Sequence, residues 1–88
     1  MKVATVQLDS NGDALITLTE YHADTVCGPT GNDQKRYRIS YPASEPEKFY
    51  NGAYAMALTA VSSGADVYLR GNGCSGTIPT VRNIRIDN

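Results

Sequence analysis

The sequence predicts an α+β fold, mostly β, in which five antiparallel strands form a small barrel or sheet and one helix, residues 45–62, packs across it. Two patterns support this prediction. Several short segments alternate apolar and polar residues, as strands do, whereas one long segment repeats its apolar residues at helical spacing. The chain has 88 residues, enough for one core, so we expect residues 1–88 to form a single domain.

The first two strands are predicted at residues 2–8 and 14–19, joined by a tight turn. The turn contains Asn11-Gly12, a strong hairpin signal because both residues tolerate positive φ. The carboxylates of this turn also resemble part of a calcium-binding loop. However, Gly12 stands two positions earlier than the glycine of such a loop, and strands instead of helices flank the turn. The sequence therefore favours a hairpin. The apolar residues expected to share faces on these strands are Ala4, Val6 and Leu8, and then Ala14, Ile16 and Leu18.

A third strand is predicted at residues 35–41, with Pro42 ending it. Its aromatic and apolar face carries Tyr37, Ile39 and Tyr41, and its polar face carries Arg36, Arg38 and Ser40.

The helix that follows is predicted to begin with a capping box between Ser44 and Glu47 and to end at Gly64. We expect its buried face to carry Phe49, Ala53, Met56, Ala57 and Ala60, with Tyr50, Tyr54, Leu58 and Val61 beside it. Replacing Met56 by Asp is therefore expected to unfold the domain. We expect self-association through a sheet edge, which remains unless the barrel closes, or through the outer face of the helix, where the flanking residues predict an exposed apolar patch.

Two further strands are predicted at residues 67–70 and 80–87, and Gly-rich loops at residues 22–34 and 71–79 each hold one cysteine. Cysteines in the loops of a small domain usually pair, so we predict a Cys27–Cys74 disulfide. Two reduced thiols are the alternative. A zinc site would need His22 as well, and the sequence has no C-x-x-C pair, so we expect no bound metal.

The overall charge and hydropathy exclude several classes of function. The net charge is −1, which does not favour binding to a nucleic-acid backbone. The arginines nevertheless cluster at Arg36 and Arg38 and at Arg70, Arg82 and Arg85, where they predict either a basic patch or a solvated strand face. No apolar run is long enough to span a membrane, and no apolar leader follows Met1. We infer from the predicted disulfide that the protein is secreted or periplasmic.

The sequence carries no recognisable catalytic motif. His22, Asp24 and a serine have the chemistry of a hydrolytic site, but no Gly-x-Ser-x-Gly elbow is present. Gly71-Asn72-Gly73 is not followed by a helix, so it does not fit a dinucleotide loop. We expect neither an enzyme nor a cofactor.

The six tyrosines are the best indication of a binding surface, since tyrosine combines apolar area with a hydroxyl group. Four of them have the periodicity of core positions: Tyr37, Tyr41, Tyr50 and Tyr54. Tyr21 and Tyr68 do not, and we predict that they bind a ligand together with Arg70 and Asn72.

The alanine-rich segment 53–60, the Gly64 turn, Val67-Tyr68-Leu69, Gly71-Asn72-Gly73-Cys74 and the final segment 81–86 resemble a family of small exported bacterial proteins of unknown function. The resemblance covers residues 36–87, although Ala65 stands where that family commonly has Lys. More distantly, the same segments resemble the oligosaccharide-binding-type (OB-like) fold of toxin B subunits of the subtilase-cytotoxin and pertussis kind. That resemblance implies pentameric rings that bind cell-surface sialoglycans, and no contact residue carries over.

Two functions follow as hypotheses. The first is an exported binding module, similar to toxin B subunits, whose ligand is a glycan or a protein. The second is a structural or accessory envelope protein that self-associates and has no soluble ligand. Either allows a homo-oligomer, as a dimer or a ring.

Overall fold

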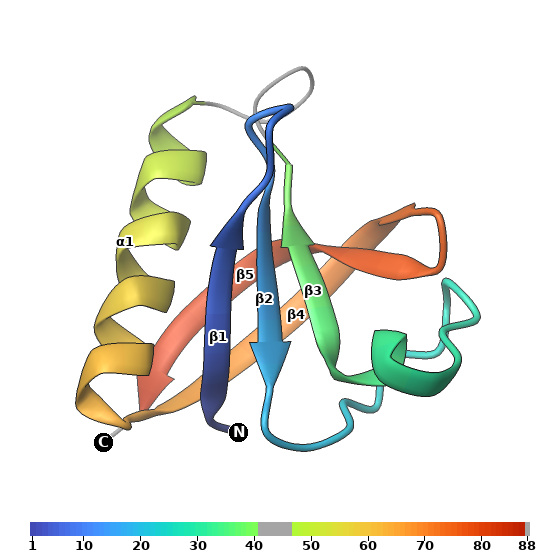
Figure 1. The fold of residues 1–88 in the computed structure, drawn as a ribbon, viewed down its shortest axis with the longest axis horizontal. Coiled ribbons are helices and arrows are strands. Elements are labelled where there is room, and N and C mark those ends of the chain that lie inside the picture. The colour runs from blue at the N-terminus through green and yellow to red at the C-terminus, as the bar shows by residue number, and fades with distance from the viewer. Residues whose placement is uncertain (41–46, 88) are drawn as a thin grey trace.

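The computed structural model describes residues 1–40 and 47–87, and it confirms a mostly β fold with one helix (Figure 1). Tyr41, Pro42 and the predicted start of the helix, with its capping box from Ser44, lie outside these residues. The helix α1 comprises Glu47–Ser63, and a short 3₁₀ helix, η1, comprises Gly31–Lys35. The strands are β1 Val3–Leu8, β2 Ala14–Leu18, β3 Arg36–Ile39, β4 Asp66–Ser75 and β5 Ile78–Asp87.

The five strands form one sheet in the order β1-β2-β3-β5-β4, which is not closed into a barrel. Three of the four pairings are antiparallel, as predicted, but β3 and β5 meet in parallel, with Arg38 opposite Thr80. These two strands are separated along the chain by α1 and β4, so no hairpin forces them to be antiparallel. The edge strands β1 and β4 approach each other at one end, where Lys2 and Asp66 form an isolated bridge.

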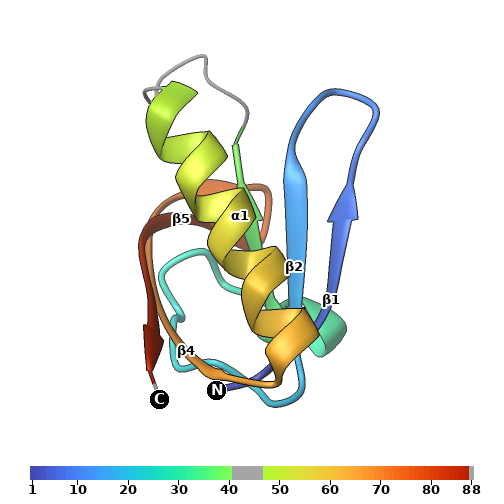
Figure 2. The same cartoon turned by 90° about the vertical axis from the view of Figure 1, so that its left-hand side faces the viewer.

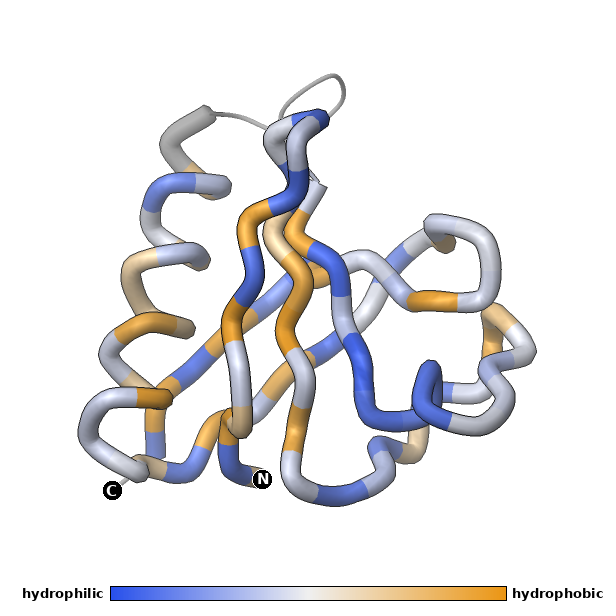
Figure 3. Tube along the Cα trace, viewed as in Figure 1, coloured by the Kyte–Doolittle hydropathy of each residue, from blue (hydrophilic) through white to orange (hydrophobic). Residues whose placement is uncertain are grey.

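The sheet is strongly bent, so that β4 and β5 cross behind β1, β2 and β3 in Figure 1. Figure 2 shows α1 lying between these two arms, and the helix packs against β1, β3 and β5. The inner side chains of β2 and β3 form the centre of the core, because Ala14, Ile16, Leu18, Tyr37 and Ile39 are all at most 2% exposed. Figure 3 shows this apolar stretch along β2 and the hydrophilic η1 at the periphery.

The alternation predicted for the first strand is interrupted by a bulge. Val3 pairs with Leu18 but Thr5 pairs with Thr17, so Ala4 is an extra residue in β1. As a result Val3 and Val6 both pack on the core, whereas Ala4 and Leu8 are exposed. The predicted grouping of Ala4, Val6 and Leu8 on one face is therefore wrong.

The predicted hairpin between the first two strands is confirmed. The Asp9 carbonyl accepts a hydrogen bond from the Gly12 amide at 2.9 Å, and Gly12 has a φ of 95° that favours glycine. Asn11 does not take positive φ, so the turn differs from the type that the Asn-Gly pair predicts. The turn also contacts the helix, since the Tyr50 hydroxyl donates to the Gly12 carbonyl at 2.6 Å.

The buried face of α1 agrees with the predicted one at Ala53, Ala57 and Ala60, but it includes Tyr50 and not Met56. Tyr50, Ala53, Ala57 and Ala60 are the buried residues, at spacings that form one stripe. Met56 is only partly buried and does not belong to the set packed against the core, so the expectation that Met56→Asp unfolds the domain loses its basis. Tyr54 and Val61 also pack on the core, which leaves Leu58, 41% exposed, as the large apolar side chain of the predicted patch.

We predict that Ala57→Leu destabilises the fold by about 1–3 kcal/mol, because the fully buried methyl group lies where α1 meets the sheet and extra atoms have no space. Chemical denaturation measures the difference. Ala55→Leu is the matched control, since Ala55 is exposed on the same helix and its replacement should change stability by less than about 0.5 kcal/mol. Equal effects at the two positions would contradict the helix orientation.

The hairpin also carries an ion pair that makes stability depend on pH. Arg38 Nη1 lies 2.5 Å from Asp9 Oδ2, and this hydrogen bond, with a weaker one from Gln7, lowers the pKa of Asp9 below its usual range. The carboxylate therefore stabilises the folded state above the unfolded pKa of about 3.9, and this contribution disappears as the pH falls through the lower folded pKa.

We predict that the melting temperature of the wild type falls more steeply between pH 6 and pH 3 than that of Asp9→Asn, which lacks the titrating group. Thermal melts followed by circular dichroism at several pH values test this. The Arg85 hydrogen bond, which lowers the pKa of Asp87, leaves some acid dependence in both proteins. Identical slopes would show that the Asp9–Arg38 pair contributes nothing.

Candidate ligand-binding site

A groove of about 590 Å³ lies between β4 and the segment that connects β2 to β3. One wall consists of residues 20–24 and Val26, and the other of residues 68–71, with Met1 at one end and the buried Tyr37 at the base. We call it the tyrosine groove. It brings together Tyr21, Tyr68 and Arg70, three of the four residues predicted to bind a ligand, although they are far apart in the sequence.

Both groove tyrosines are exposed, and each has a cation over its ring. Tyr68 is 45% exposed and lies opposite Arg85 on β5, whose Cζ is 4.8 Å from the ring centroid. Tyr21 is 64% exposed, and Lys35 Nζ lies 5.2 Å from its ring centroid. Arg85 is itself held by Asp87, at 2.7 Å from Nε to Oδ1, which raises the pKa of the guanidinium further. One face of each ring is therefore covered by a positive charge.

Two charged groove residues, Asp24 and Arg70, form no ion pair within the described residues. The Asp24 carboxylate accepts a hydrogen bond from the Val26 amide, whereas the exposed Arg70 guanidinium has neither an ion pair nor a hydrogen bond there. Asn72, the fourth predicted residue, lies outside the tyrosine groove, in an adjoining hollow of about 330 Å³ lined by Arg70, Arg82 and Asn83. Arg70 belongs to both cavities, so the predicted set is divided between two neighbouring surfaces.

The base of the groove is formed by close packing around Gly71. A side chain at this position would collide with a carboxylate oxygen of Asp24, and its Cβ would lie 2.9 Å from Pro79 and 3.3 Å from the Tyr37 ring. Burial, together with the nearby Asp24 carboxylate and Tyr68, raises the pKa of Tyr37 to about 12. Tyr37 is therefore a neutral phenol under ordinary conditions.

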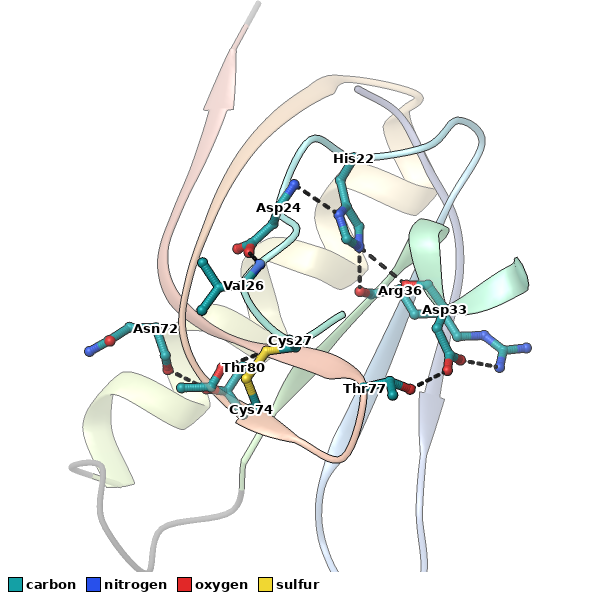
Figure 4. The surroundings of a disulfide bond; sticks show 11 residues. His22, Asp24, Val26, Cys27, Asp33, Arg36, Asn72, Cys74, Thr77 and Thr80 are labelled. Atoms are coloured by element: carbon teal, nitrogen blue, oxygen red, sulfur yellow. Dashed lines mark hydrogen bonds and ion pairs between the residues drawn. A yellow bond between two sulfur atoms is a disulfide. The ribbon is translucent and has the colours of Figure 1, made fainter. Parts of the chain in front are cut away.

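His22 fixes the outer wall, and both of its ring nitrogens contact backbone groups (Figure 4). Nε2 lies 3.2 Å from the Asp33 carbonyl oxygen and 3.0 Å from that of Arg36, so it carries the proton and donates to them. Nδ1 accepts the Asp24 amide at 3.3 Å. The ring also packs on Tyr37, with 4.6 Å between centroids. His22 is thus engaged on both sides, and neither nitrogen faces a serine hydroxyl.

The Cys27–Cys74 disulfide is confirmed, with 5.6 Å between the Cα atoms, and it attaches the outer wall to the β4–β5 hairpin (Figure 4). Both sulfurs are in the bond, which rules out the reduced thiols and the zinc alternative. Cys74 lies on β4 and not in a loop, because β4 and β5 extend to a tight turn beyond it. A second attachment follows nearby, where the Thr77 hydroxyl donates to the Asp33 carboxylate at 2.5 Å.

No pattern in the sequence placed Asp24, Val26, Leu69 or Gly71 at this site, because their proximity arises from the path of the β2–β3 segment. Among the residues described, no three His, Cys, Asp or Glu side chains are arranged to hold a metal ion. In residues 1–40 and 47–87, no helix has both the length and the apolar character of a membrane span.

No protein-family model matches the chain, and neither the curated proteins nor the solved structures contain a match to it. The resemblance to exported bacterial proteins and to toxin B subunits therefore stays a prediction.

We predict that replacing Cys27 and Cys74 together by Ser lowers the free energy of unfolding by about 2–4 kcal/mol, since the bond spans 47 positions of the unfolded chain. Urea denaturation of both proteins gives the difference. Intact mass before and after reduction provides the control, with a gain of about two daltons expected for one disulfide. A double variant as stable as the wild type would contradict the prediction and would show that the disulfide does not contribute to the free energy of unfolding.

Proposed function

We propose that this protein is a binding module that acts outside the cytoplasm and takes its ligand in the tyrosine groove. One observation carries the proposal. Five large apolar side chains are exposed among the described residues, and three of them line the groove: Tyr21, Val26 and Tyr68. Val26 is 87% exposed, although it belongs to a wall fixed on both sides by the disulfide and by His22. Apolar area gathered on a rigid concave surface is typical of a binding site.

The chemistry of the groove suits a glycan or a protein. Tyrosine rings pack on the apolar faces of sugars and on side chains, and their hydroxyl groups exchange hydrogen bonds with either. Arg70 adds a positive charge without a partner in the described residues, so a ligand with an acidic group gains an ion pair there. The resemblance to toxin B subunits supports the same class of function.

Two further features support the proposed location outside the cytoplasm and the proposal of binding instead of catalysis. Disulfides persist in oxidising compartments, so the Cys27–Cys74 bond favours a secreted or periplasmic location. The engagement of both His22 nitrogens by backbone groups favours binding over hydrolysis, because a general base needs a free nitrogen.

The alternative function is self-association in an envelope, as a dimer or a ring. Its predicted basis was a sheet edge or an apolar patch on the outer side of the helix. The sheet is not closed and keeps β1 and β4 as edge strands, but the patch is reduced because Tyr50, Tyr54 and Val61 pack inward. Leu58 and Leu8, the exposed large apolar residues outside the groove in the part of the chain that the structure describes, belong to different elements. The surface therefore favours the groove, and sedimentation at tens of micromolar measures the oligomeric state directly.

The test is to probe an array of glycans and an array of short peptides with the oxidised protein. We predict binding on one array, and a loss of affinity of about tenfold or more for Tyr68→Ala, because an aromatic residue in a groove is a typical hot spot. Leu58→Ala is the matched control, since it removes an exposed apolar side chain elsewhere and should leave the affinity unchanged. Binding on neither array, or equal losses for both variants, would overturn the proposal.

A further inference from the structure

The edge of β4 that faces the tyrosine groove is only partly paired. The opposite edge of β4 pairs with β5 along its length. On the groove side, the Val67 amide donates to the Met1 carbonyl at 2.6 Å, and the Met1 amino group lies 3.2 Å from the Val67 carbonyl oxygen. With the bridge between Lys2 and Asp66, these contacts form a short antiparallel pairing between residues 1–2 and 66–67.

Beyond Val67, the edge of β4 enters the groove. In an antiparallel strand the backbone N–H and C=O groups of alternate residues face the same side. Because those of Val67 face Met1, those of Leu69 face the same way, and Leu69 lines the groove. In the described part of the chain, no loop backbone group forms a hydrogen bond with Leu69. Leu69 is 5% exposed as a residue, but it lines the groove, and its N–H and C=O are the donor and acceptor that this edge offers to another strand.

We propose that the ligand of the tyrosine groove is an extended peptide segment that adds to the free edge of β4, in line with the first residues of this chain. The inference rests on the proposed function and names its ligand class. The backbone of the segment forms hydrogen bonds with Leu69, and its side chains contact the walls. Residues 68–71 span about 13 Å at ~3.3 Å per residue, so about four residues of the ligand lie in the groove.

The side chains around the edge define the sequence that this segment needs. Tyr68 and Arg70 are both exposed and lie two residues apart on β4, so they flank the same face of the added strand. The other charges of the groove already have contacts, since Glu20 lies 3.9 Å from the Met1 amino group and the Asp24 carboxylate accepts the Val26 amide at 3.4 Å. An acidic residue beside Arg70 and an apolar or aromatic residue beside Tyr68 therefore fit the site best.

A peptide matches this edge better than a sugar does because its N–H and C=O groups repeat with the same spacing as those of β4. The pairing with Met1 shows that the edge accepts a strand in the antiparallel direction. The same geometry predicts that residues added before Met1 would continue along β4 and occupy the groove.

The experiment uses an array of acetylated and amidated hexapeptides in which β-branched, aromatic and acidic residues vary. The best binder is then remade with one N-methyl group at each position in turn. We predict that methylation at every second position lowers the affinity about tenfold or more and that the intervening positions tolerate it, because only alternate N–H groups face β4. The exchange of the Leu69 amide, measured by NMR, should slow in the complex.

Two variants, each with a matched control, add independent readouts. Arg70→Ala should lower the affinity for the acidic peptide and leave that for its amide counterpart nearly unchanged, whereas Leu58→Ala should change neither. Thr-Val-Thr-Val placed before Met1 should compete for the groove and reduce binding at least tenfold, whereas the same four residues placed after Asn88 should have no effect.

The outcomes separate this inference from the proposed function. A peptide that binds without the two-residue pattern of N-methyl effects would overturn addition to the β4 edge, as would binding unaffected by the extension before Met1. Binding to glycans alone, still sensitive to Tyr68→Ala, would overturn the peptide inference and support the binding module. Binding on neither array would overturn both.

Discussion

The attachment of the β2–β3 segment to the β4–β5 hairpin is the constraint on which the candidate site depends. The core places α1 between the arms of a bent sheet, but it does not determine where a connection outside the sheet should lie. The Cys27–Cys74 bond and the Thr77–Asp33 hydrogen bond fix this segment to the hairpin, and His22 fixes it to β3 and η1. Without these contacts residues 20–26 would not face β4, and the chain would have a strand edge but no groove.

Periodicity predicted the elements of this fold well, since short alternating segments and one helical segment occur where the sequence places them. Periodicity was less reliable in predicting which side chains of an element face the core. On the helix it identified Ala53, Ala57 and Ala60 as buried, but it placed Met56 on that face and Tyr50 beside it, whereas Tyr50 is buried and Met56 only partly so. The three alanines allow the helix to approach the sheet closely. In β1, one extra residue at Ala4 changed which side chains face inward, and a bulge of this kind leaves no clear trace in the sequence.

The candidate site was predicted in part, for a reason that the structure makes plain. Tyr21 and Tyr68 were selected because they did not fit a core pattern, and both are exposed in one groove. Their proximity was not predictable, because it depends on the path of the segment before Cys27. Asn72 lies in the irregular stretch of β4 between Gly71 and Cys74, where the register with β5 shifts, and it lines the adjoining hollow instead. The glycine-rich sequence around Cys74 indicated a loop, but it continues as strand because paired backbones approach closely where side chains are small.

The cations that cover the groove tyrosines have a consequence for the entropy of binding. A free exposed tyrosine loses rotational freedom when a ligand packs on it, and this loss weakens binding by about 0.5–1.5 kcal/mol for each side chain that becomes fixed. Arg85, itself held by Asp87, and Lys35 restrict the Tyr68 and Tyr21 rings before any ligand arrives. Part of the ordering has therefore taken place during folding, and a small ligand with few contacts retains more of its interaction energy as affinity. Because exposed cations are screened by salt, this preorganisation weakens as ionic strength rises.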